Sequence, residues 1–327
     1  MDINDIAKAA GVSRATVSRF LNNGYVSAEK RELIARVIEQ TGYVPSSHAQ
    51  TLRTGRTRLV GVIIPKINSH SVGRMVAGIT RELDKAGYQV LIANTGNDEN
   101  KELEYLSIFS ERNQVDGIIL IATVVTPAHK RALEALALPV VVLGQQVDGV
   151  SCVYHDDYHA LLDVTREVLA SAKNPGFIGF KEVDVAAGRM RRQGFLDACA
   201  EAGIELADAA LETGEFTADS GYFCTERLLD GVPGLDAIIC ASDDVAFGAL
   251  TCLREYGHRV PEDVAVTGVG DGSLAAIAFP ALTTVHFFYR TSGEEAARML
   301  VSAIDDGERV PRQLMMGHRL MRRSTTR

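Results

Sequence analysis

The spacing of apolar residues predicts two kinds of structure that follow one another along the chain. Apolar residues first recur at helical spacing over residues 3–10, with Asp2 in the N-cap position, and Gly11 then permits a sharp turn. Ser13 is a second N-cap position, so the following residues predict a second short helix. A third helix is expected over about residues 27–41. Together the three helices predict a small globular unit.

From residue 59 onward, apolar β-type runs alternate with helical stretches, which indicates a parallel sheet covered on both faces. A second series of the same kind follows, so the chain carries two α/β units in tandem. Ligands of such sheets bind at the carboxyl ends of the strands, and a cleft between the units is the expected binding site. The expected strands are 59–64, 88–94, 117–122, 140–143, 177–180, 237–241 and 264–269, and the expected helices are 73–86, 99–111, 128–137, 188–202, 219–229 and 245–256.

The second short helix carries chemistry on its outward face. Val12 and Val17 are expected to face inward, which leaves Arg14, Ala15 and Arg19 for solvent or a ligand. Arginine can donate two hydrogen bonds to guanine in the major groove of DNA, and hydroxyl groups can bind phosphates. Two helices with this face predict a DNA-reading element. The alternative is an ordinary amphipathic helix pair with a solvated basic face.

Charge is divided unevenly along the chain, and the division favours the DNA interpretation. The 327 residues are 46% hydrophobic and carry a net charge of −8. Residues 1–58 contain 9 Lys and Arg against 5 Asp and Glu, whereas the rest contains 25 against 37. The positive charge therefore lies at the N-terminal end, and the acidic remainder resists non-specific binding to DNA.

The 5 cysteines are widely scattered and include no CxxC pair, which predicts reduced thiols and argues against a zinc site. No apolar run reaches the length of a membrane span, and the N-terminus is polar where a signal peptide would be apolar. We therefore expect a cytoplasmic protein with no membrane partner.

Residues 5–22 fit the pattern DIAxxAGVSxxTVSRxLN, and VSAEKRE, GYVPSSHAQTL and the tandem α/β body follow. This arrangement resembles the bacterial transcription regulators of the lactose and galactose repressor family (LacI/GalR). The segments PKINSHS and VYHDDYHA are similar to the sucrose and trehalose operon repressors of that family. The resemblance implies an all-α helix-turn-helix headpiece and an α/β body like the periplasmic binding proteins, with two parallel-sheet subdomains.

The resemblance also implies domain limits. The headpiece is expected over residues 1–45, a hinge helix or linker over 46–58, and an effector-binding and dimerisation domain over 59–327. Within the body, the first subdomain is expected over about 59–155 and 289–312, and the second over about 156–288 and 313–327. Three strands are expected to cross between them.

Residues of the headpiece and hinge take DNA-binding roles from the same resemblance. Arg14 and Ala15 are the expected base-reading pair in the major groove. Leu52 would be an apolar wedge inserted into the minor groove of a palindromic operator, although a surface leucine with a packing role is the alternative. The supporting base, phosphate and groove contacts are expected from Ser13, Thr16, Ser18, Arg19, Asn22 and Ala49.

In the body, the resemblance implies an effector site for a small molecule between the subdomains. Arg191 would bind sugar hydroxyls, with pairing to a surface carboxylate as the alternative. Phe216 would stack on a sugar face or belong to the core, and Tyr289 would lie at the cleft floor. Ser242 and Asp243 would form a polar pair at the cleft wall, although Asp243 could instead be the N-cap of the following helix.

Departures from the family pattern favour a sugar over a purine as the effector. Lys66 stands where many members have an acid, and Ser71 stands where they have an aromatic residue. This cleft should be more polar and more positive, and Lys66 with the amides of the next helix could hold a phosphate, unless it is simply solvated. Gly270 replaces the first residue of an Asp-Asp pair, which leaves Asp271 to make that contact. A disaccharide such as sucrose or trehalose, or its phosphate, is favoured.

The run His155, Asp156, Asp157 could in principle ligate a metal. Consecutive strand residues point alternately to opposite faces, so the three cannot easily converge. The resemblance places them at a crossover between subdomains. We expect no metal and no cofactor.

The expected function is a non-enzymatic DNA-binding regulator, which a sugar or sugar phosphate controls allosterically. The expected partners are operator DNA, the effector and a second copy of the chain. A dimer is favoured over a tetramer, because no heptad tail that would join two dimers follows the last predicted strand. A sugar-binding receptor is the alternative, but it leaves residues 2–58 without a role. An α/β nucleotide-binding enzyme would need a GxGxxG motif or a P-loop, and the sequence has neither.

Overall fold

The computed structural model describes residues 2–22, 24–43, 55–111, 114–307 and 310–327. The chain divides into two compact units, Met1–Arg58 and Leu59–Arg327. Ala49 and Leu52, the expected groove contacts of the hinge, lie outside the described residues, so their roles stay predictions.

The N-terminal unit has the three expected helices: α1 (Ile3–Ala9), α2 (Arg14–Leu21) and α3 (Ala28–Thr41). Asp2 and Asp5 form a reciprocal capping box at α1, and the Ser13 side chain caps α2 by accepting from the Thr16 amide. Apolar side chains from all three helices and their connections form one small core: Ile6, Ala7, Ala10, Val17, Val26 and Ile34.

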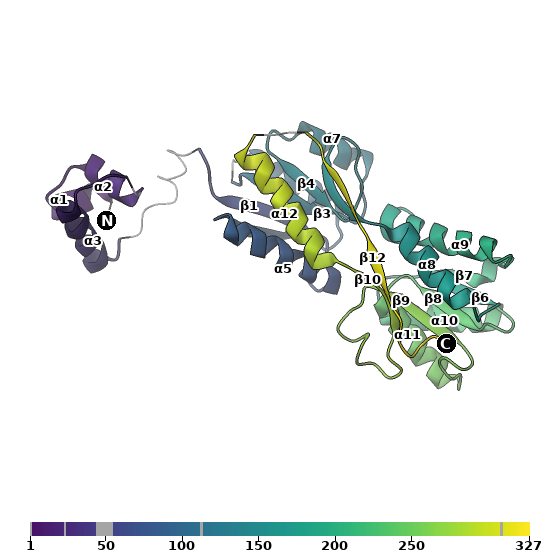
Figure 1. The fold of residues 1–327 in the computed structure, drawn as a ribbon. Coiled ribbons are helices and arrows are strands. Elements are labelled where there is room, and N and C mark those ends of the chain that lie inside the picture. The colour runs from purple at the N-terminus through teal and green to yellow at the C-terminus, as the bar shows by residue number, and fades with distance from the viewer. Residues whose placement is uncertain (1, 23, 44–54, 112–113, 308–309) are drawn as a thin grey trace. The chain divides into compact units, whose positions relative to one another are not determined.

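The first part of the body is a parallel sheet of six strands in the order β11-β5-β4-β3-β1-β2 (Figure 1). Its strands are β1 (Leu59–Ile64), β2 (Gln89–Asn94), β3 (Gly117–Ile121), β4 (Val140–Leu143), β5 (Ser151–His155) and β11 (Gln313–Met316). The helices α5 (His70–Lys85) and α12 (Tyr289–Asp305) pack on one face, and α6 (Glu99–Glu111) and α7 (Pro127–Ala135) pack on the other.

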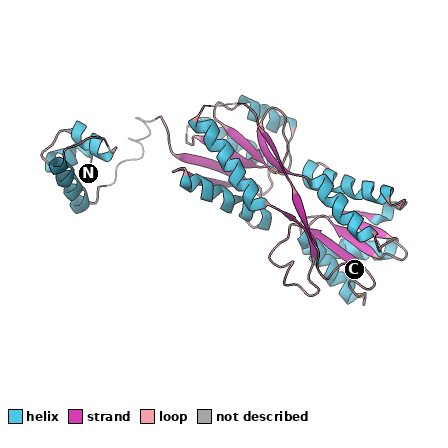
Figure 2. Ribbon diagram, viewed as in Figure 1, coloured by secondary structure: helices cyan, strands magenta, loops and turns pink. Residues whose placement is uncertain are grey.

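The second part is another six-stranded sheet, in the order β12-β10-β9-β8-β6-β7, in which only the β10–β12 pairing is antiparallel. Figure 2 shows helices on both sides of its strands. The strands are β6 (Pro175–Gly179), β7 (Leu211–Thr213), β8 (Ala237–Cys240), β9 (Ala265–Val269), β10 (Thr283–Phe287) and β12 (His318–Met321). The helices are α8 (Asp157–Leu169), η1 (Val185–Met190), α9 (Arg191–Glu201), η2 (Asp208–Ala210), α10 (Ala218–Gly231) and α11 (Asp243–Glu255).

The chain passes between the two sheets at three places in the described body. β5 leads into α8, β10 leads into α12, and β11 continues into β12 through Gly317 (Figure 1). The third crossing differs from the expected boundary at residue 312, because β11 pairs with β5 as part of the first sheet. Residues 313–316 therefore belong to the first subdomain, and the second resumes at β12.

Helices α5 and α12 approach each other with almost no space between their backbones. A Cβ atom on Gly78 would lie 2.0 Å from the carbonyl oxygen of Arg290, and one on Gly293 would lie 2.1 Å from that of Met75. Only glycine permits this contact from both sides. The two helices therefore form a rigid layer on the first sheet.

The expected helix over residues 188–202 is replaced by two elements. A π-helical turn, η1, covers Val185–Met190, and α9 then begins at Arg191. Asp184 caps η1 by accepting from the Ala187 amide at 3.0 Å. An extra residue per turn rotates the side chains that follow it, and such turns are frequent at functional sites.

Candidate functional site

The expected DNA-reading face of α2 is exposed in the structure. Val17 is buried beneath the helix, whereas Arg14, Ala15 and Arg19 are exposed. The hydroxyl groups of Ser13 and Thr16 are hydrogen-bonded to each other at the start of the helix, with their oxygens 2.9 Å apart. Ser18 and Asn22 continue the same face, and the Asn22 side chain donates to the Ser18 carbonyl oxygen. Two cations and small side chains therefore stand together on a helix of two turns, which suits entry into a groove.

Arg191 is the central charged group of the body. It is 8% exposed, its Nε donates to Asp157 Oδ1 at 2.7 Å, and its Nη1 donates to the Ala241 carbonyl oxygen at 2.6 Å. Its guanidinium carbon lies 5.4 Å from the ring centroid of Phe287. Burial by itself lowers the pKa of Arg191, but the Asp157 carboxylate outweighs it and holds the pKa above its usual value. The partner is thus a buried carboxylate, and pairing with a surface carboxylate is wrong.

Aromatic rings from the crossings surround this arginine. Tyr289, the first residue of α12, is buried, and its ring centroid lies 5.8 Å from that of Phe287. The His155 ring lies 4.9 Å from Phe287 and 5.0 Å from Tyr289. Burial raises the pKa of Tyr289 to about 12, so its hydroxyl stays protonated and available as a donor. Tyr289 therefore lies close to Arg191, and its place at the floor of an effector cleft stays a prediction.

Asp243 holds the loop that follows β9 in place through two hydrogen bonds. Its Oδ2 accepts from the Gly272 amide at 2.7 Å, and its Oδ1 accepts from the Thr284 hydroxyl at 2.5 Å. Burial raises the pKa of Asp243, and these two donors oppose the rise. The N-cap of α11 is Ser242, whose hydroxyl accepts from the Val245 amide, so the alternative that Asp243 is the N-cap is wrong.

Asp271 lies on that loop in a left-handed conformation with φ of 49°. Its carboxylate accepts from Arg323 at 2.6 Å and lies 2.8 Å from His286 Nδ1. Burial acts to raise the pKa of Asp271, but Arg323 and His286 outweigh it and the pKa is lowered. The carboxylate is thus held within the second subdomain. Its contact with an effector stays a prediction.

Lys66 and Phe216 meet across the two subdomains. The Lys66 Nζ lies 5.9 Å from the centroid of the Phe216 ring, which stacks on Phe180 with centroids 3.5 Å apart. Phe216 is 40% exposed, which rules out the alternative that it belongs to the core. Ser71 lies in the first turn of α5, where its hydroxyl oxygen is 3.1 Å from that of Ser69.

Two further contacts bridge the subdomains, and the sequence did not point to either. Gln145 Nε2 donates to the Thr123 carbonyl oxygen at 2.7 Å and to Asp184 Oδ1 at 2.9 Å. Arg74 Nη1 donates to the carbonyl oxygens of Gly270 and Asp271, each at 3.3 Å, and its guanidinium carbon lies 5.8 Å from the Tyr289 ring. These contacts depend on residues far apart in the chain. The only sequence signal was the N-cap character of Asp184 before a helix.

The structure thus brings four of the eight expected effector residues to one junction. Arg191 and Tyr289 share the aromatic cluster, Arg74 connects Tyr289 with the loop of Asp271, and Asp243 holds that loop. Lys66 and Phe216 form a separate contact between the subdomains. Ser71 and Ser242 are engaged only with neighbours on their own elements in the contacts described for this part of the chain.

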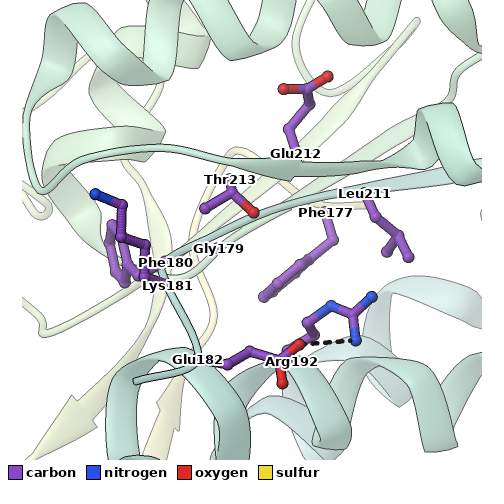
Figure 3. A pocket seen from close by; sticks show the side chains of 9 residues that line it. All are labelled: Phe177, Gly179, Phe180, Lys181, Glu182, Arg192, Leu211, Glu212 and Thr213. Carbon is purple, nitrogen blue, oxygen red and sulfur yellow. Dashed lines mark ion pairs between the residues drawn. The ribbon is translucent and has the colours of Figure 1, made fainter. Parts of the chain in front are cut away.

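A cavity of about 150 Å³ lies elsewhere, beside the ends of β6 and β7 (Figure 3). Its charged walls are already paired: Glu182 lies 3.2 Å from Arg192, Glu212 lies 2.7 Å from Arg227, and Lys181 lies 3.5 Å from Glu215. None of the expected effector residues lines it. We therefore place the candidate site at the junction around Arg191 rather than in this cavity.

The described ranges contain neither a membrane-spanning helix nor a metal-ligand cluster. In these ranges no helix has both the length and the apolar character needed to cross a membrane. No group of three His, Cys, Asp or Glu side chains there is arranged to hold a metal ion. Within the run His155–Asp157, each residue has a different setting: an aromatic cluster, the N-cap of α8 and the ion pair with Arg191.

Comparison with known proteins decides the family. The model described as "Bacterial regulatory proteins, lacI family" matches residues 2–46, and the "Periplasmic binding protein-like domain" matches residues 170–326. The sucrose operon repressor of Staphylococcus xylosus is 32% identical over 298 residues, which are 90% of this chain and 91% of that protein. The chain belongs to the lacI family of bacterial regulatory proteins.

Solved structures share the fold of this chain. The complex of the transcriptional regulator CelR with cellobiose has a TM-score of 0.76 and 31% identity, covering 99% of each chain. The lac repressor dimer bound to operator and the anti-inducer ONPF has a TM-score of 0.91, covering 100% of this chain and 99% of that one. At 23% identity the latter shows the fold alone. The predicted family and fold class are confirmed, and the chain is a DNA-binding transcription regulator rather than a member of an enzyme family.

Proposed function

We propose that this lacI-family regulator represses a carbohydrate-utilisation operon, and that a sugar or sugar phosphate bound at the junction of the two subdomains controls its operator affinity. The observation that carries the proposal is the setting of Arg191. The guanidinium is buried, fixed by Asp157 and the Ala241 carbonyl oxygen, and placed beside Phe287 at a crossing. A rigid fork of donors next to aromatic rings suits vicinal hydroxyl groups of a sugar.

A disaccharide such as sucrose or trehalose, or its phosphate, is the effector we favour. A relative is named for the sucrose operon, and CelR was solved with cellobiose, a sugar of the same size class. In this proposal the effector contacts are Arg191, Tyr289, Asp243, Asp271, Ser242, Phe216, Ser71 and Lys66. Lys66 and the first turn of α5, where Ser71 lies, supply the positive charge and amide groups that a phosphate would need.

In the headpiece, α2 would enter the major groove of a pseudo-palindromic operator. Arg14 and Ala15 would read base edges, because they are exposed together at the start of the helix. Ser13, Thr16, Ser18, Arg19 and Asn22 would support base and phosphate contacts. Ala49 and Leu52 complete the proposal as minor-groove contacts on the basis of the resemblance alone.

A palindromic operator calls for a two-fold symmetric protein, and we propose a homodimer. One loop of the second subdomain exposes Leu274, Ile277 and Phe279 together. Apolar side chains gathered in this way mark a protein interaction surface more often than a solvated one. A second copy of the chain is the partner that the symmetry requires.

In this proposal, operator affinity is controlled because effector binding and operator binding favour different arrangements of the two subdomains. The bridges Gln145–Asp184 and Arg74–Gly270 join the subdomains in the arrangement seen here, so a molecule that favours another arrangement must break or replace them. The effector changes operator affinity only by the ratio of its affinities for the two arrangements.

The test is operator binding by the purified protein, followed by fluorescence anisotropy while sucrose, trehalose, cellobiose, glucose and their phosphates are added. We expect one disaccharide or disaccharide phosphate to change operator affinity at low concentration. Operator affinity should fall steeply with salt because cations are released from DNA, whereas affinity for a neutral sugar should barely change. A protein that binds no DNA sequence preferentially would contradict the proposal.

Lys66→Ala decides between a free and a phosphorylated sugar. If the effector is a phosphate, the variant should lose response to the phosphate by at least tenfold and keep its response to the free sugar. Ser69→Ala, which removes a hydroxyl near the same helix start, is the matched control. Equal responses of Lys66→Ala and the wild type to the phosphate would rule out the phosphate role of Lys66.

A further inference from the structure

His155 occupies the junction between two of the three crossings. It is the last residue of β5, and its ring packs against Phe287, which ends β10, and Tyr289, which begins α12. It is 8% exposed. The imidazole is therefore enclosed by the groups that connect the subdomains, next to the residues proposed to bind the effector.

One nitrogen of this imidazole is buried without a hydrogen bond in the described part of the chain. Nε2 is buried, and the residues that the structure describes offer it no hydrogen-bond partner. Its neighbours are satisfied by contrast, since Arg191 donates to both Asp157 and the Ala241 carbonyl oxygen. A buried polar atom without a partner costs stability, and an apolar side chain would avoid that cost.

A second buried histidine, His129, also has an Nε2 without a hydrogen bond in the described residues, but the groups around it differ. His129 Nε2 lies 3.3 Å from a carboxylate oxygen of Glu102, and its Nδ1 lies 2.8 Å from the Thr126 hydroxyl. Both nitrogens of His129 therefore face polar groups inside one subdomain. His155 differs in lying at the junction, where its Nε2 has neither a hydrogen bond nor an ion pair among the described residues.

The charge state of His155 limits what it can bind. Burial lowers the pKa of His155 to about 4, with Arg191 lowering it further and Asp157 opposing. Tyr289, the other titratable group against the ring, stays protonated because burial raises its pKa to about 12. At neutral pH the imidazole carries no charge, so each nitrogen either donates or accepts one hydrogen bond. A hydroxyl group can accept a hydrogen bond from a donating nitrogen or donate one to an accepting nitrogen, whereas a phosphate would bind a protonated imidazole more strongly than a neutral one.

We propose that His155 Nε2 binds a hydroxyl group of the carbohydrate effector when the junction opens to admit it, and so helps to decide which sugar is recognised. The inference rests on the proposed function, because it assumes an effector at this junction. Arg191 supplies a charged guanidinium group, and His155 supplies a neutral imidazole nearby. Together the two groups would favour a sugar ring with hydroxyl groups over an anion. The cost of the unpaired nitrogen in the free protein is then offset when the sugar binds.

Three substitutions at His155 distinguish the role of its Nε2 atom from the role of its ring packing. His155→Phe keeps the ring packing against Phe287 and Tyr289 but removes both nitrogens. His155→Gln places an amide near the position of Nε2, and His155→Asn places one near Nδ1. The control is His159→Phe, an exposed histidine one turn along α8 that pairs with Asp156. Affinity for the strongest disaccharide effector of the wild type is measured by calorimetry on the full chain without DNA.

We expect His155→Phe and His155→Asn to weaken sugar binding at least tenfold, with His155→Gln closer to the wild type and His159→Phe unchanged. Operator affinity without sugar should be the same in all four variants. The melting temperature of His155→Phe should equal or exceed that of the wild type, because the unpaired nitrogen is gone. Wild-type sugar affinity in His155→Phe would overturn the proposal, and so would loss in His155→Gln with retention in His155→Asn.

Monodeoxy analogues of the same disaccharide supply an independent readout. One analogue should bind the wild type more weakly than the parent disaccharide does, and it should bind His155→Phe as well as it binds the wild type. This double-mutant cycle identifies the hydroxyl group that His155 contacts. If every analogue loses affinity in parallel in both proteins, His155 contacts no hydroxyl and the inference fails. A wild type that binds no sugar would instead overturn the proposed function itself.

Discussion

Arg191 and Asp157 form the ion pair on which the junction depends. Both side chains are buried, so neither charge has water to replace a lost partner. We expect Asp157→Asn to lower the free energy of unfolding by about 3–5 kcal/mol, because it leaves the guanidinium charge buried and uncompensated. Urea denaturation of the full chain measures this change.

The control for that variant is Asp163→Asn on the same helix. Asp163 contacts Arg166 and His318 with half of its side chain exposed, and exposed pairs contribute little to stability. Equal loss of stability in the two variants would contradict the burial argument. It would indicate instead that α8 responds to any loss of negative charge.

His155 also gives the fold a specific response to acid. Its pKa is about 4 in the folded chain against an ordinary value of 6.5, so the unfolded chain binds the proton first as pH falls. The stability contribution of a neutral His155 is therefore present above about pH 6.5 and is lost as pH falls toward 4, by up to about 3 kcal/mol.

The comparison that isolates this contribution is the wild type against His155→Phe, each unfolded by urea at several pH values. The difference in unfolding free energy should be constant from pH 7 to 8 and should change steadily in favour of the variant between pH 6.5 and 4. A difference that stays flat over the whole range would show that His155 does not resist protonation in the folded chain.

At the scale of elements, the proposal assigns the sequence specificity to α2. Arg14→Ala should abolish the preference for operator over unrelated DNA while leaving sugar binding intact, because a forked donor to a base edge contributes to discrimination rather than to general attraction. Anisotropy with operator and scrambled duplexes measures both affinities. Arg36→Ala, an exposed arginine on α3, is the charge-matched control. Unchanged discrimination in Arg14→Ala would remove Arg14 from the reading face.

The contact of α5 with α12 depends on glycine. Gly78→Ala should lower the melting temperature by several degrees, because its Cβ would lie 2.0 Å from a backbone oxygen and the helices would have to separate. Gly73→Ala lies on the same helix with nothing within 4 Å of the new atom, so it should leave stability unchanged or raise it. Similar melting temperatures for the two variants would show that the helices separate at little cost.

Periodicity predicted most elements, because each buries one face or one continuous run. The three helices of the headpiece and the strands β1, β3 and β4 lie where the apolar pattern placed them. The π-helical turn at Val185–Met190 was not predicted, because its extra residue leaves no periodic signal. β7 was not predicted either, because its three residues are too few to show an alternating pattern.

For the whole molecule, self-association is the prediction that the surface supports. Ile277→Asp should convert a dimer to a monomer and weaken operator binding, because a charge replaces an exposed apolar contact. Sedimentation velocity gives the mass in solution. Ile67→Asp, an equally exposed isoleucine in the first subdomain, is the control. A dimer that survives Ile277→Asp would exclude this loop as the interface.

The candidate site was predictable only in part, since it is made by residues that meet through the fold. Arg191, Asp243 and Tyr289 followed from the family resemblance, and the structure places them near one junction. Gln145 and Asp184, which bridge the subdomains, lie 39 positions apart in the chain. No local pattern encodes such a pair, so only the three-dimensional arrangement shows it.

The passage of β11 into β12 through Gly317 has a consequence for biosynthesis. These strands are edge strands of the two different sheets, and β11 pairs with β5, which lies about half of the chain earlier. Neither sheet is complete until residues 313–321 have left the ribosome. Each sheet of a nascent chain therefore lacks an edge strand until that point, and such late, non-local pairing slows folding. Premature termination before Gln313 would therefore leave both sheets without an edge strand at once.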